Sequence, residues 1–170
     1  MVEPIENKVE KSLKSAEGLY HRLVLIVGKC SSGKTTVIQN VAKQHNTTPI
    51  NINLTLSEKL LELTKKQRAL KLSEILSRTV NGKGQKVFLD NIEILFDVSL
   101  KQDPLRLLQG LSRNLTVAAS WNGGINKGKL TYAEPGHSEY RSYDLTDILV
   151  VNMNGEATVD FKYSSEDKQA

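Results

Sequence analysis

Residues 28–36 constrain this chain more than any other stretch. They read Gly-Lys-Cys-Ser-Ser-Gly-Lys-Thr-Thr, so that two glycines enclose four free positions and a lysine and a threonine follow the second glycine. An apolar run at residues 23–27 comes immediately before this stretch, and apolar residues at helical spacing follow it from Val37. The sequence therefore predicts a glycine-containing turn that joins a buried strand to a helix.

A turn of this kind is the phosphate-binding loop of nucleotide-binding proteins. Gly28 and Gly33 permit the backbone to turn around a phosphate, so that N–H groups and the positive end of the helix point at the anion. We expect Lys34 to reach the β- and γ-phosphates and the Thr35 hydroxyl to hold Mg²⁺. The alternative is a glycine turn that carries a lysine by chance, and the flanking strand and helix favour the nucleotide. The cofactor-binding residues predicted for ATP and Mg²⁺ are Gly28, Lys29, Cys30, Ser31, Ser32, Gly33, Lys34, Thr35 and Thr36.

Size and composition point to one soluble domain. The chain has 170 residues, which is enough to bury a single core. No apolar run approaches the roughly 20 residues of a membrane helix, and the first residues do not resemble a signal peptide. We expect a cytoplasmic protein with one nucleotide-binding domain at residues 1–163, in which residues 1–22 form an N-terminal helix and lead-in, and a disordered tail at residues 164–170.

The charge balance permits a nucleic-acid surface but does not indicate one. The formal net charge of +4 comes from 23 Lys and Arg against 19 Asp and Glu, and the excess is scattered. The basic clusters at residues 65–68 and 83–86 contain no aromatic residues for base stacking, so we interpret them as solvated faces. Cys30 is the only cysteine, which excludes an internal disulfide, and we interpret it as a tolerated small residue.

Strands and helices are expected to alternate through the first half of the chain. The spacing of apolar residues predicts a helix over residues 4–18 and a strand over residues 50–54. Ser57 is expected to cap a first crossover helix, and a second helical piece is expected over residues 70–79.

The second half is expected to be less regular. A helix should start at residues 102–104 and close at Asn114, before a strand over residues 115–120. Residues 123–144 are rich in Gly, Pro and polar side chains and are expected to form a long functional loop. A strand over residues 148–151 should then pair, across a turn at Asn154-Gly155, with an edge strand over residues 157–163.

Asp90 supplies the second element of a nucleotide site. It directly follows the apolar strand at residues 86–89, and a carboxylate at that position can hold the water shell of Mg²⁺. An Asp at a simple turn is the alternative interpretation. The alternation of strands and helices predicts a three-layer α/β fold with a parallel sheet, which binds ligands at the carboxyl ends of its strands.

The spacing also suggests a branch of this fold class. An extra strand lies between the phosphate-binding loop and Asp90, as in the cores of AAA+ and RecA-like ATPases, which this order resembles. In those families the strand of Asp90 is not the neighbour of the loop strand. A polar residue at the end of the next strand, here Ser120 or Asn122, would act as the sensor of the γ-phosphate.

The chain departs from the AAA+ pattern at the residue that activates water. AAA+ proteins usually place a glutamate after the aspartate as a general base, whereas this chain has Asn91. An amide orients water but accepts no proton, so turnover is expected to be slow unless Glu93 or Glu58 substitutes. Glu93 is nearer in sequence, although it could instead cap or pair on the following helix.

A second cation is expected at the γ-phosphate. In AAA+ rings an arginine from a neighbouring subunit supplies it. Arg141 lies in the corresponding region, and Arg113 is the alternative, although a cation at a helix end also suits the helix dipole. Trp121 is expected either to stack on adenine or to pack at the edge of the sheet.

Four stretches carry a closer resemblance. Residues 88–96, 100–108, 120–123 and 130–137 are similar to the BrxF family, the small P-loop proteins of type-3 BREX phage-defence systems. The resemblance covers roughly residues 20–152. It implies a bacterial cytoplasmic protein that works with other BREX components, including a DNA methyltransferase, a phosphatase-like protein and larger ATPases.

These observations leave three functions open. The first is an AAA+-like ATPase whose nucleotide state controls assembly with itself or with defence proteins. The second, motivated by Asn91, is an adaptor or DNA-binding accessory protein that binds ATP but hardly hydrolyses it. A small-molecule kinase is disfavoured, because the 123–144 segment contains only one arginine where such kinases close an arginine-rich lid.

Overall fold

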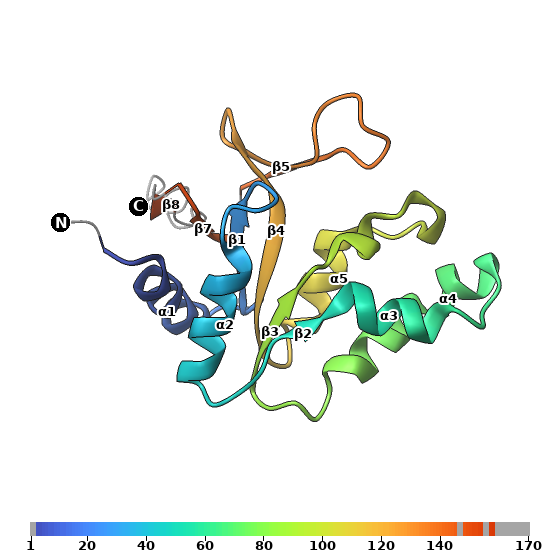
Figure 1. Cartoon of the computed structure of the whole chain (residues 1–170), viewed down its shortest axis with the longest axis horizontal. Helices are drawn as coiled ribbons and strands as arrows, with labels where there is room; N and C mark the ends of the chain where they lie inside the picture. The colour runs from blue at the N-terminus through green and yellow to red at the C-terminus, as the bar shows by residue number, and fades with distance from the viewer. Residues whose placement is uncertain (1–2, 146–147, 155–156, 159–170) are drawn as a thin grey trace.

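The computed structural model of the chain describes residues 3–145, 148–154 and 157–158. Its central parallel sheet has the strand order β2-β3-β4-β1-β7, and the edge strand β8 is antiparallel to β7. Helices α1 and α2 cover one face of the sheet, and α3, α4 and α5 cover the other (Figure 1). The elements are α1 Ile5–Ala16, β1 Leu23–Gly28, α2 Lys34–Gln44, β2 Ile50–Asn51, α3 Ile52–Leu60, α4 Lys65–Val80, β3 Lys86–Asp90, the 3₁₀ helices η1 Glu93–Phe96 and η2 Val98–Leu100, α5 Pro104–Leu111, β4 Thr116–Asn126, β5 Lys129–Tyr132, β6 Arg141–Asp144, β7 Leu149–Asn152 and β8 Ala157–Thr158.

The strand order confirms the fold class predicted from the sequence. Strand β4 lies between β1, which precedes the phosphate-binding loop, and β3, which ends in Asp90. The chain therefore folds as a three-layer α/β unit in which the strands of the loop and of Asp90 are not neighbours, the order expected from the resemblance to AAA+ and RecA-like cores. The loop, Asp90 and the end of the parallel part of β4 lie at the same edge of the sheet.

The central strand β1 explains why the sheet is covered on both faces. All its residues are buried, and successive side chains point to opposite faces. Leu25 and Val27 belong to the core shared with α3, α4 and α5, while Val24 and Ile26 belong to the core shared with α1 and α2. An apolar run without alternation thus fits a strand buried on both sides.

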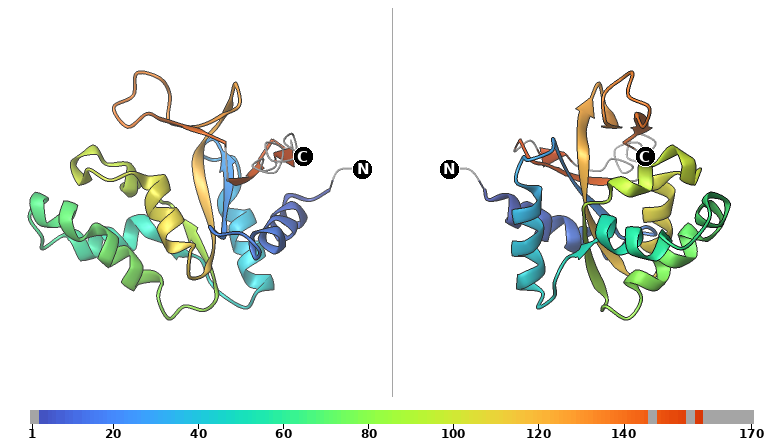
Figure 2. Two further views of the ribbon diagram at one scale, coloured as in Figure 1. Left: turned by 180° about the vertical axis from the view of Figure 1, so that it is seen from behind. Right: turned by 45° about the vertical axis from the view of Figure 1, so that its right-hand side comes forward.

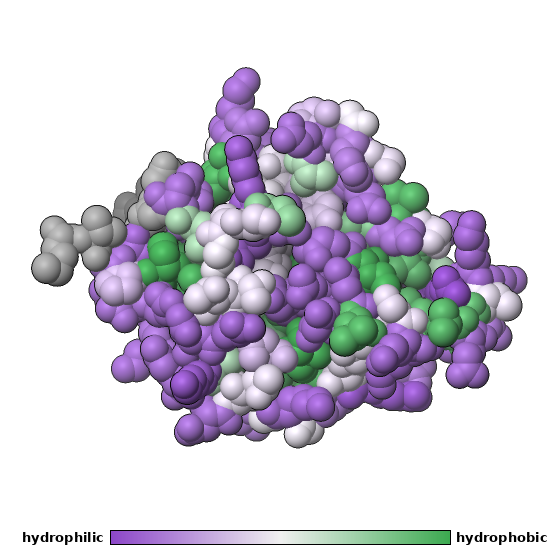
Figure 3. Space-filling view, in the orientation of Figure 1, coloured by the Kyte–Doolittle hydropathy of each residue, from purple (hydrophilic) through white to green (hydrophobic). Residues whose placement is uncertain are grey.

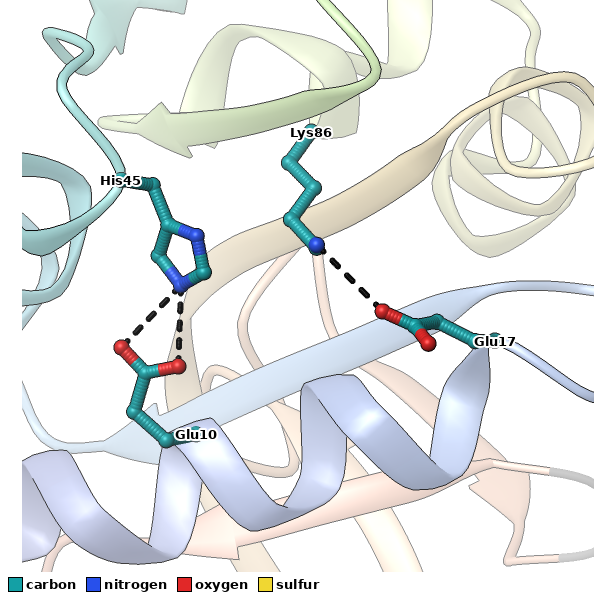
Figure 4. A network of polar contacts seen from close by, with 4 residues as sticks. All are labelled: Glu10, Glu17, His45 and Lys86. Atoms are coloured by element: carbon teal, nitrogen blue, oxygen red, sulfur yellow. Dashed lines mark hydrogen bonds and ion pairs between the residues drawn. The ribbon is translucent and has the colours of Figure 1, made fainter.

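Helix α1 confirms the expected N-terminal helix and packs beside α2. It buries Val9, Leu13 and Ala16 against the sheet. Two polar contacts hold it, one from its middle and one from its C-terminal cap: Glu10 contacts His45 at 2.9 Å and Glu17 pairs with Lys86 at 3.3 Å (Figure 4). Such partly exposed ion pairs contribute little free energy, so the buried apolar residues carry most of the docking.

The strand predicted over residues 50–54 is wrong. Strand β2 contains only Ile50 and Asn51, because the Asn51 side chain accepts a hydrogen bond from the Leu54 N–H and caps α3. The predicted cap at Ser57 is wrong for the same reason, since that residue lies inside the helix. Helix α4 also begins earlier than the 70–79 piece, at a capping box formed by Thr64 and Gln67.

The long loop predicted over residues 123–144 is wrong in most of its length. Strand β4 continues to Asn126 and forms a three-stranded antiparallel arm with β5 and β6. A tight turn through Lys127 and Gly128, both with positive φ, joins β4 to β5. The arm projects past the carboxyl ends of the parallel strands (Figures 1 and 2), and only residues 133–140 remain a loop.

Aromatic side chains anchor this arm to the core. Tyr132 of β5 stacks on Phe96 with ring centroids 3.5 Å apart, and the Trp121 indole donates a hydrogen bond of 3.0 Å to the Thr131 carbonyl oxygen. Gly123 lies so close to that carbonyl that no side chain would fit there. Trp121 is fully buried, so it packs in the core and is not free to stack on a base.

The C-terminal hairpin is confirmed as far as it is described. Strands β7 and β8 pair antiparallel, with Val151 opposite Ala157. The rest of the predicted edge strand, residues 159–163, and the tail predicted at residues 164–170 lie outside the described residues.

Among the described residues, no helix is both long and apolar enough to cross a bilayer. The face in Figure 3 is mostly hydrophilic and carries hydrophobic patches on the side of α3 and α4. Leu54, Leu61 and Leu70 are large exposed apolar residues of this region.

Candidate nucleotide-binding site

The loop between β1 and α2 owes its shape to its two glycines. Gly33 has φ +97° at the N-cap of α2, a conformation that other residues rarely adopt. Gly28 is needed for a different reason: a Cβ there would lie 2.8 Å from the Met153 Cγ, which packs behind the loop. Gly33 thus ends the loop at the N-terminus of α2, the end of a helix that binds anions through its N–H groups.

Lys34 folds back over this loop. Its ammonium group donates to the Gly28 carbonyl oxygen at 2.9 Å and to the Lys29 carbonyl oxygen at 2.6 Å. The residue is only 6% exposed, and burial lowers its pKa, although the charges of Cys30, Glu93 and Asp90 oppose that shift. A phosphate in the loop would give this buried cation the anionic partner that the carbonyl groups replace only in part.

Asp90 lies at the end of β3 and is held by two donors. The Ser120 hydroxyl donates to its Oδ1 at 2.8 Å, and the Asn91 backbone N–H donates to the same oxygen at 3.0 Å. Both bonds fall on Oδ1, which leaves Oδ2 to accept from a metal-bound water.

Glu93 is held by two amide side chains. Asn122 of β4 donates to its Oε2 at 2.8 Å, and Asn53 of α3 donates to its Oε1 at 2.9 Å. Asn53 is itself fixed, since its Oδ1 accepts from the Ile94 N–H at 2.7 Å and its own N–H donates to the Asn91 carbonyl oxygen at 2.8 Å. The alternative in which Glu93 pairs with a cation on the following helix finds no support in these contacts.

Asn53 was not predicted from the sequence. It lies two residues after β2 ends at the carboxyl edge of the sheet, where polar residues meet a ligand in this fold class. This position could not be recognised from the sequence, because residues 50–54 alternate between apolar and polar residues as a strand does. Asn53 was therefore predicted to lie within a strand and not after one.

An open pocket of about 470 Å³ lies between the loop, β3 and β4. It gathers most of the residues that the sequence singled out. Its lining residues are Cys30, Ser31, Gly33, Lys34, Thr35, Asp90, Asn91, Glu93, Ser120 and Asn122. Gly28, Lys29 and Ser32 instead line a neighbouring cavity of about 570 Å³ behind the loop, and Thr36 lines neither.

The two arginines expected at the γ-phosphate lie away from this pocket. Arg141 is on β6, and its guanidinium donates to the Gln102 carbonyl oxygen at 3.3 Å. Its Nε is buried and has no hydrogen-bond partner within the described part of the chain. Arg113 stacks on the Tyr20 ring at 5.0 Å. Glu58, the alternative base, is exposed on α3 and does not line the pocket.

The residues at the pocket fit a magnesium ion bound together with phosphates. Thr35 and Asp90 offer oxygen ligands, which Mg²⁺ prefers, and the ion usually keeps several waters. Within the described ranges no group of three or more His, Cys, Asp or Glu could hold a metal by itself.

Comparison with known proteins reaches only to the overall fold. No protein-family model and no curated protein matches the chain. Two solved structures similar to it are AMPPCP-bound DnaA from Aquifex aeolicus, at 14% identity and a TM-score of 0.38 over 71% of this chain, and PCH-2 from C. elegans, at 16% identity and a TM-score of 0.42 over 91%. The chain spans 39% and 41% of their respective lengths.

Proposed function

We propose that this protein binds ATP with Mg²⁺ in the pocket between the loop and β3, and hydrolyses it slowly. The observation that supports this function is the meeting of Lys34, Thr35 and Asp90 with the carboxylate of Glu93 in one pocket. The first three suit the phosphates and the metal, and Glu93 offers the proton acceptor that Asn91 cannot provide.

In the proposed reaction a water molecule attacks the γ-phosphorus. The bond from that phosphorus to the bridging oxygen of the β-phosphate breaks, and ADP and inorganic phosphate leave. Glu93 takes a proton from the attacking water, while Lys34 and the N–H groups of the loop stabilise the charge on the phosphate oxygens. Mg²⁺ at Thr35 and Asp90 would neutralise charge on the β- and γ-phosphates.

Slow turnover is proposed because Asn91, and not a glutamate, directly follows Asp90. Each carboxylate oxygen of Glu93 accepts a hydrogen bond, from Asn53 and from Asn122. These two bonds fix the orientation of the carboxylate. The adjacent Asn91 can orient water but accepts no proton. We therefore retain, as a second candidate, an adaptor that binds ATP and hardly hydrolyses it.

We also propose that the nucleotide state controls assembly with another copy of this chain or with partner proteins. Of the described residues that line the pocket, Lys34 is the only cation, so the γ-phosphate lacks a second one. Arg141 of another copy is proposed to supply it. The resemblance of the motifs to BrxF supports a bacterial phage-defence role among BREX proteins, including a DNA methyltransferase. That role and a cytoplasmic location remain proposals.

Binding and turnover can be separated with matched variants. ATP affinity is measured by calorimetry and phosphate release at steady state, for wild type, Lys34→Ala, Asp90→Ala and Glu93→Gln. Lys34→Ala should lose binding, and Glu93→Gln should bind normally but release no phosphate above background. Glu58→Gln is the control, because Glu58 is exposed outside the pocket.

Three outcomes decide between the candidates. Equal ATP binding by wild type and Lys34→Ala would overturn the nucleotide site. ATP binding by wild type without phosphate release above background would favour the adaptor. Loss of phosphate release in Glu58→Gln, but not in Glu93→Gln, would transfer the role of the base to Glu58.

Assembly is tested by light scattering with and without ATP and Mg²⁺. A nucleotide-dependent increase in mass that Arg141→Ala abolishes and Arg113→Ala retains would support Arg141 acting between copies. A monomer at every nucleotide concentration would count against self-assembly.

A further inference from the structure

Ser120 is a buried hydroxyl in a strand where the fold does not require one. It is 2% exposed in β4, and the two residues before it, Ala118 and Ala119, are also buried. Alternation along the strand places Ala119 and Trp121 in the core shared with α3 to α5 and Ala118 in the core shared with α2. Ser120 therefore faces the same side as α2, where a small apolar residue would pack equally well.

The hydroxyl serves a single described partner, the carboxylate of Asp90. The Ser120 Oγ donates to Asp90 Oδ1 at 2.8 Å, and both residues line the pocket. Asp90 is only 7% exposed, and the structure records no ion pair for it within the described ranges. A buried carboxylate without a cation depends on its hydrogen-bond donors for orientation and for stability.

The Lys34 ammonium group does not form an ion pair with the Asp90 carboxylate. It is bound to the carbonyl oxygens of Gly28 and Lys29. Two neutral donors thus hold Asp90 Oδ1, and the negative charge of the carboxylate remains available to a cation in the pocket. Removal of one donor would leave only the Asn91 N–H, which cannot by itself fix the rotation of the carboxylate group.

We propose that Ser120 is a positioning residue that sets the affinity of the nucleotide site for Mg²⁺. Its hydroxyl holds the Asp90 carboxylate so that Oδ2 receives a metal-bound water. Hydrogen-bond partners of metal-binding carboxylates tune metal affinity in this way. The inference rests on the proposed binding of ATP with Mg²⁺ and adds a residue that acts through Asp90.

The test measures binding and not turnover. The affinity for a fluorescent ATP analogue is determined in EDTA and at increasing free Mg²⁺, for wild type and Ser120→Ala. Ser120→Ala should keep the wild-type affinity for the ATP analogue in EDTA. The Mg²⁺ concentration that gives half of the metal-dependent increase in this affinity should rise by about 10-fold or more. Ser120→Thr keeps a hydroxyl and should return that concentration close to the wild-type value.

Two further variants exclude a purely structural effect. Ser112→Ala also removes a buried hydroxyl, one that donates to the Gln109 carbonyl oxygen far from the pocket, and it should leave the Mg²⁺ dependence unchanged. Ser120→Cys keeps nearly the size of serine but has a weaker donor, so it should shift the Mg²⁺ dependence in the same direction as Ser120→Ala. It replaces Ser120→Ala in the test if that variant is unstable.

The result that overturns the inference is specific. A Ser120→Ala protein with the wild-type Mg²⁺ dependence contradicts it, and so does an equal loss of affinity with and without Mg²⁺. A wild-type protein that binds no nucleotide would overturn the proposed function, and this inference with it. Nucleotide binding that does not depend on Mg²⁺ in wild type would overturn the inference and the metal part of the proposed function, but not the binding of nucleotide in the pocket.

Discussion

Asn122 donates a hydrogen bond of 2.8 Å to Glu93 Oε2, which joins the end of the parallel part of β4 to the 3₁₀ helix η1. Two residues earlier on the same strand, Ser120 donates to Asp90. The even spacing places both donors on one face of β4, above the phosphate-binding loop. One strand thus orients the two carboxylates of the pocket, the one proposed to face Mg²⁺ and the one proposed to face water.

The first prediction concerns the hold on Glu93. Asn122→Ala removes one of the two hydrogen-bond donors to Glu93. Phosphate release should fall by about 10-fold or more, while ATP affinity should change little. This result is expected for an interaction that matters in the transition state and not in binding. Steady-state kinetics and calorimetry measure the two quantities. Asn126→Ala, at the exposed end of the same strand, is the control. An unchanged kcat in Asn122→Ala would remove Asn122 from the mechanism.

The second prediction concerns Gly28. In Gly28→Ala the new Cβ would lie 2.5 Å from Ser32 Oγ and 2.8 Å from Met153 Cγ, so the side chains of Ser32 and Met153 must shift. We expect the free energy of unfolding to fall by about 1–3 kcal/mol and ATP affinity to fall with it. Gly110→Ala meets open space inside α5 and should instead stabilise the protein by about 0.5–1 kcal/mol. Urea unfolding compares them, and equal stabilities of the two variants would contradict this account of the loop.

The third prediction concerns the buried ammonium of Lys34. Burial lowers its pKa below the ordinary 10.5. Between this lowered pKa and pH 10.5 the unfolded chain therefore binds more protons than the folded chain. The contribution of Lys34 to the free energy of unfolding rises with pH through that interval. Lys34→Met should be more stable than wild type at neutral pH, because it removes the penalty of burying a charge.

This gain should disappear as the pH approaches 10.5, where the wild-type lysine loses its proton in both states. Urea unfolding at a series of pH values measures it. Lys34→Met should also lose ATP binding, as expected where a functional residue is retained at the expense of stability. A Lys34→Met protein less stable than wild type at neutral pH would show that the hydrogen bonds of the ammonium outweigh its desolvation.

The fourth prediction concerns the attachment of the arm. The Asp103 carboxylate caps α5 by accepting from the Leu105 N–H, and it also accepts from the Tyr143 hydroxyl at 2.9 Å. Burial, reinforced by this carboxylate, raises the pKa of Tyr143, which keeps the hydroxyl protonated as a donor. Asp103→Ala should cost about 1–2 kcal/mol and Tyr143→Phe about 1 kcal/mol.

The two substitutions share one interaction, so the double variant should lose less free energy than the sum of the single ones. A double-mutant cycle by urea unfolding measures this coupling. Strict additivity would mean that the hydrogen bond between Asp103 and Tyr143 contributes nothing to holding the arm.

The sequence predicted the parts of the protein that depend on neighbouring residues. The loop at residues 28–36, the strand before it and Asp90 after a second strand are short-range patterns with strong steric causes, such as the positive φ of Gly33. The sequence failed where a side chain competes with the backbone. Asn51 caps a helix in a stretch that alternates like a strand, and Gly123 and Gly124 look like chain breakers although they lie within β4.

The sequence by itself thus determined the P-loop pattern, the order of the strands and helices that form the parallel sheet, and which residues carry phosphate-binding chemistry. Only the tertiary structure decided how the polar residues divide their roles: Ser120 with Asp90, and Asn53 and Asn122 with Glu93. These bonds join residues 29 to 40 positions apart. Ser120 and Asn122 reach these carboxylates because β4 lies beside β3, in the order expected from AAA+ and RecA-like cores, and Asn53 does so because β2 lies on the other side of β3. Spacing along one chain does not specify which donor pairs with which carboxylate, because each pairing depends on how side chains from different elements pack.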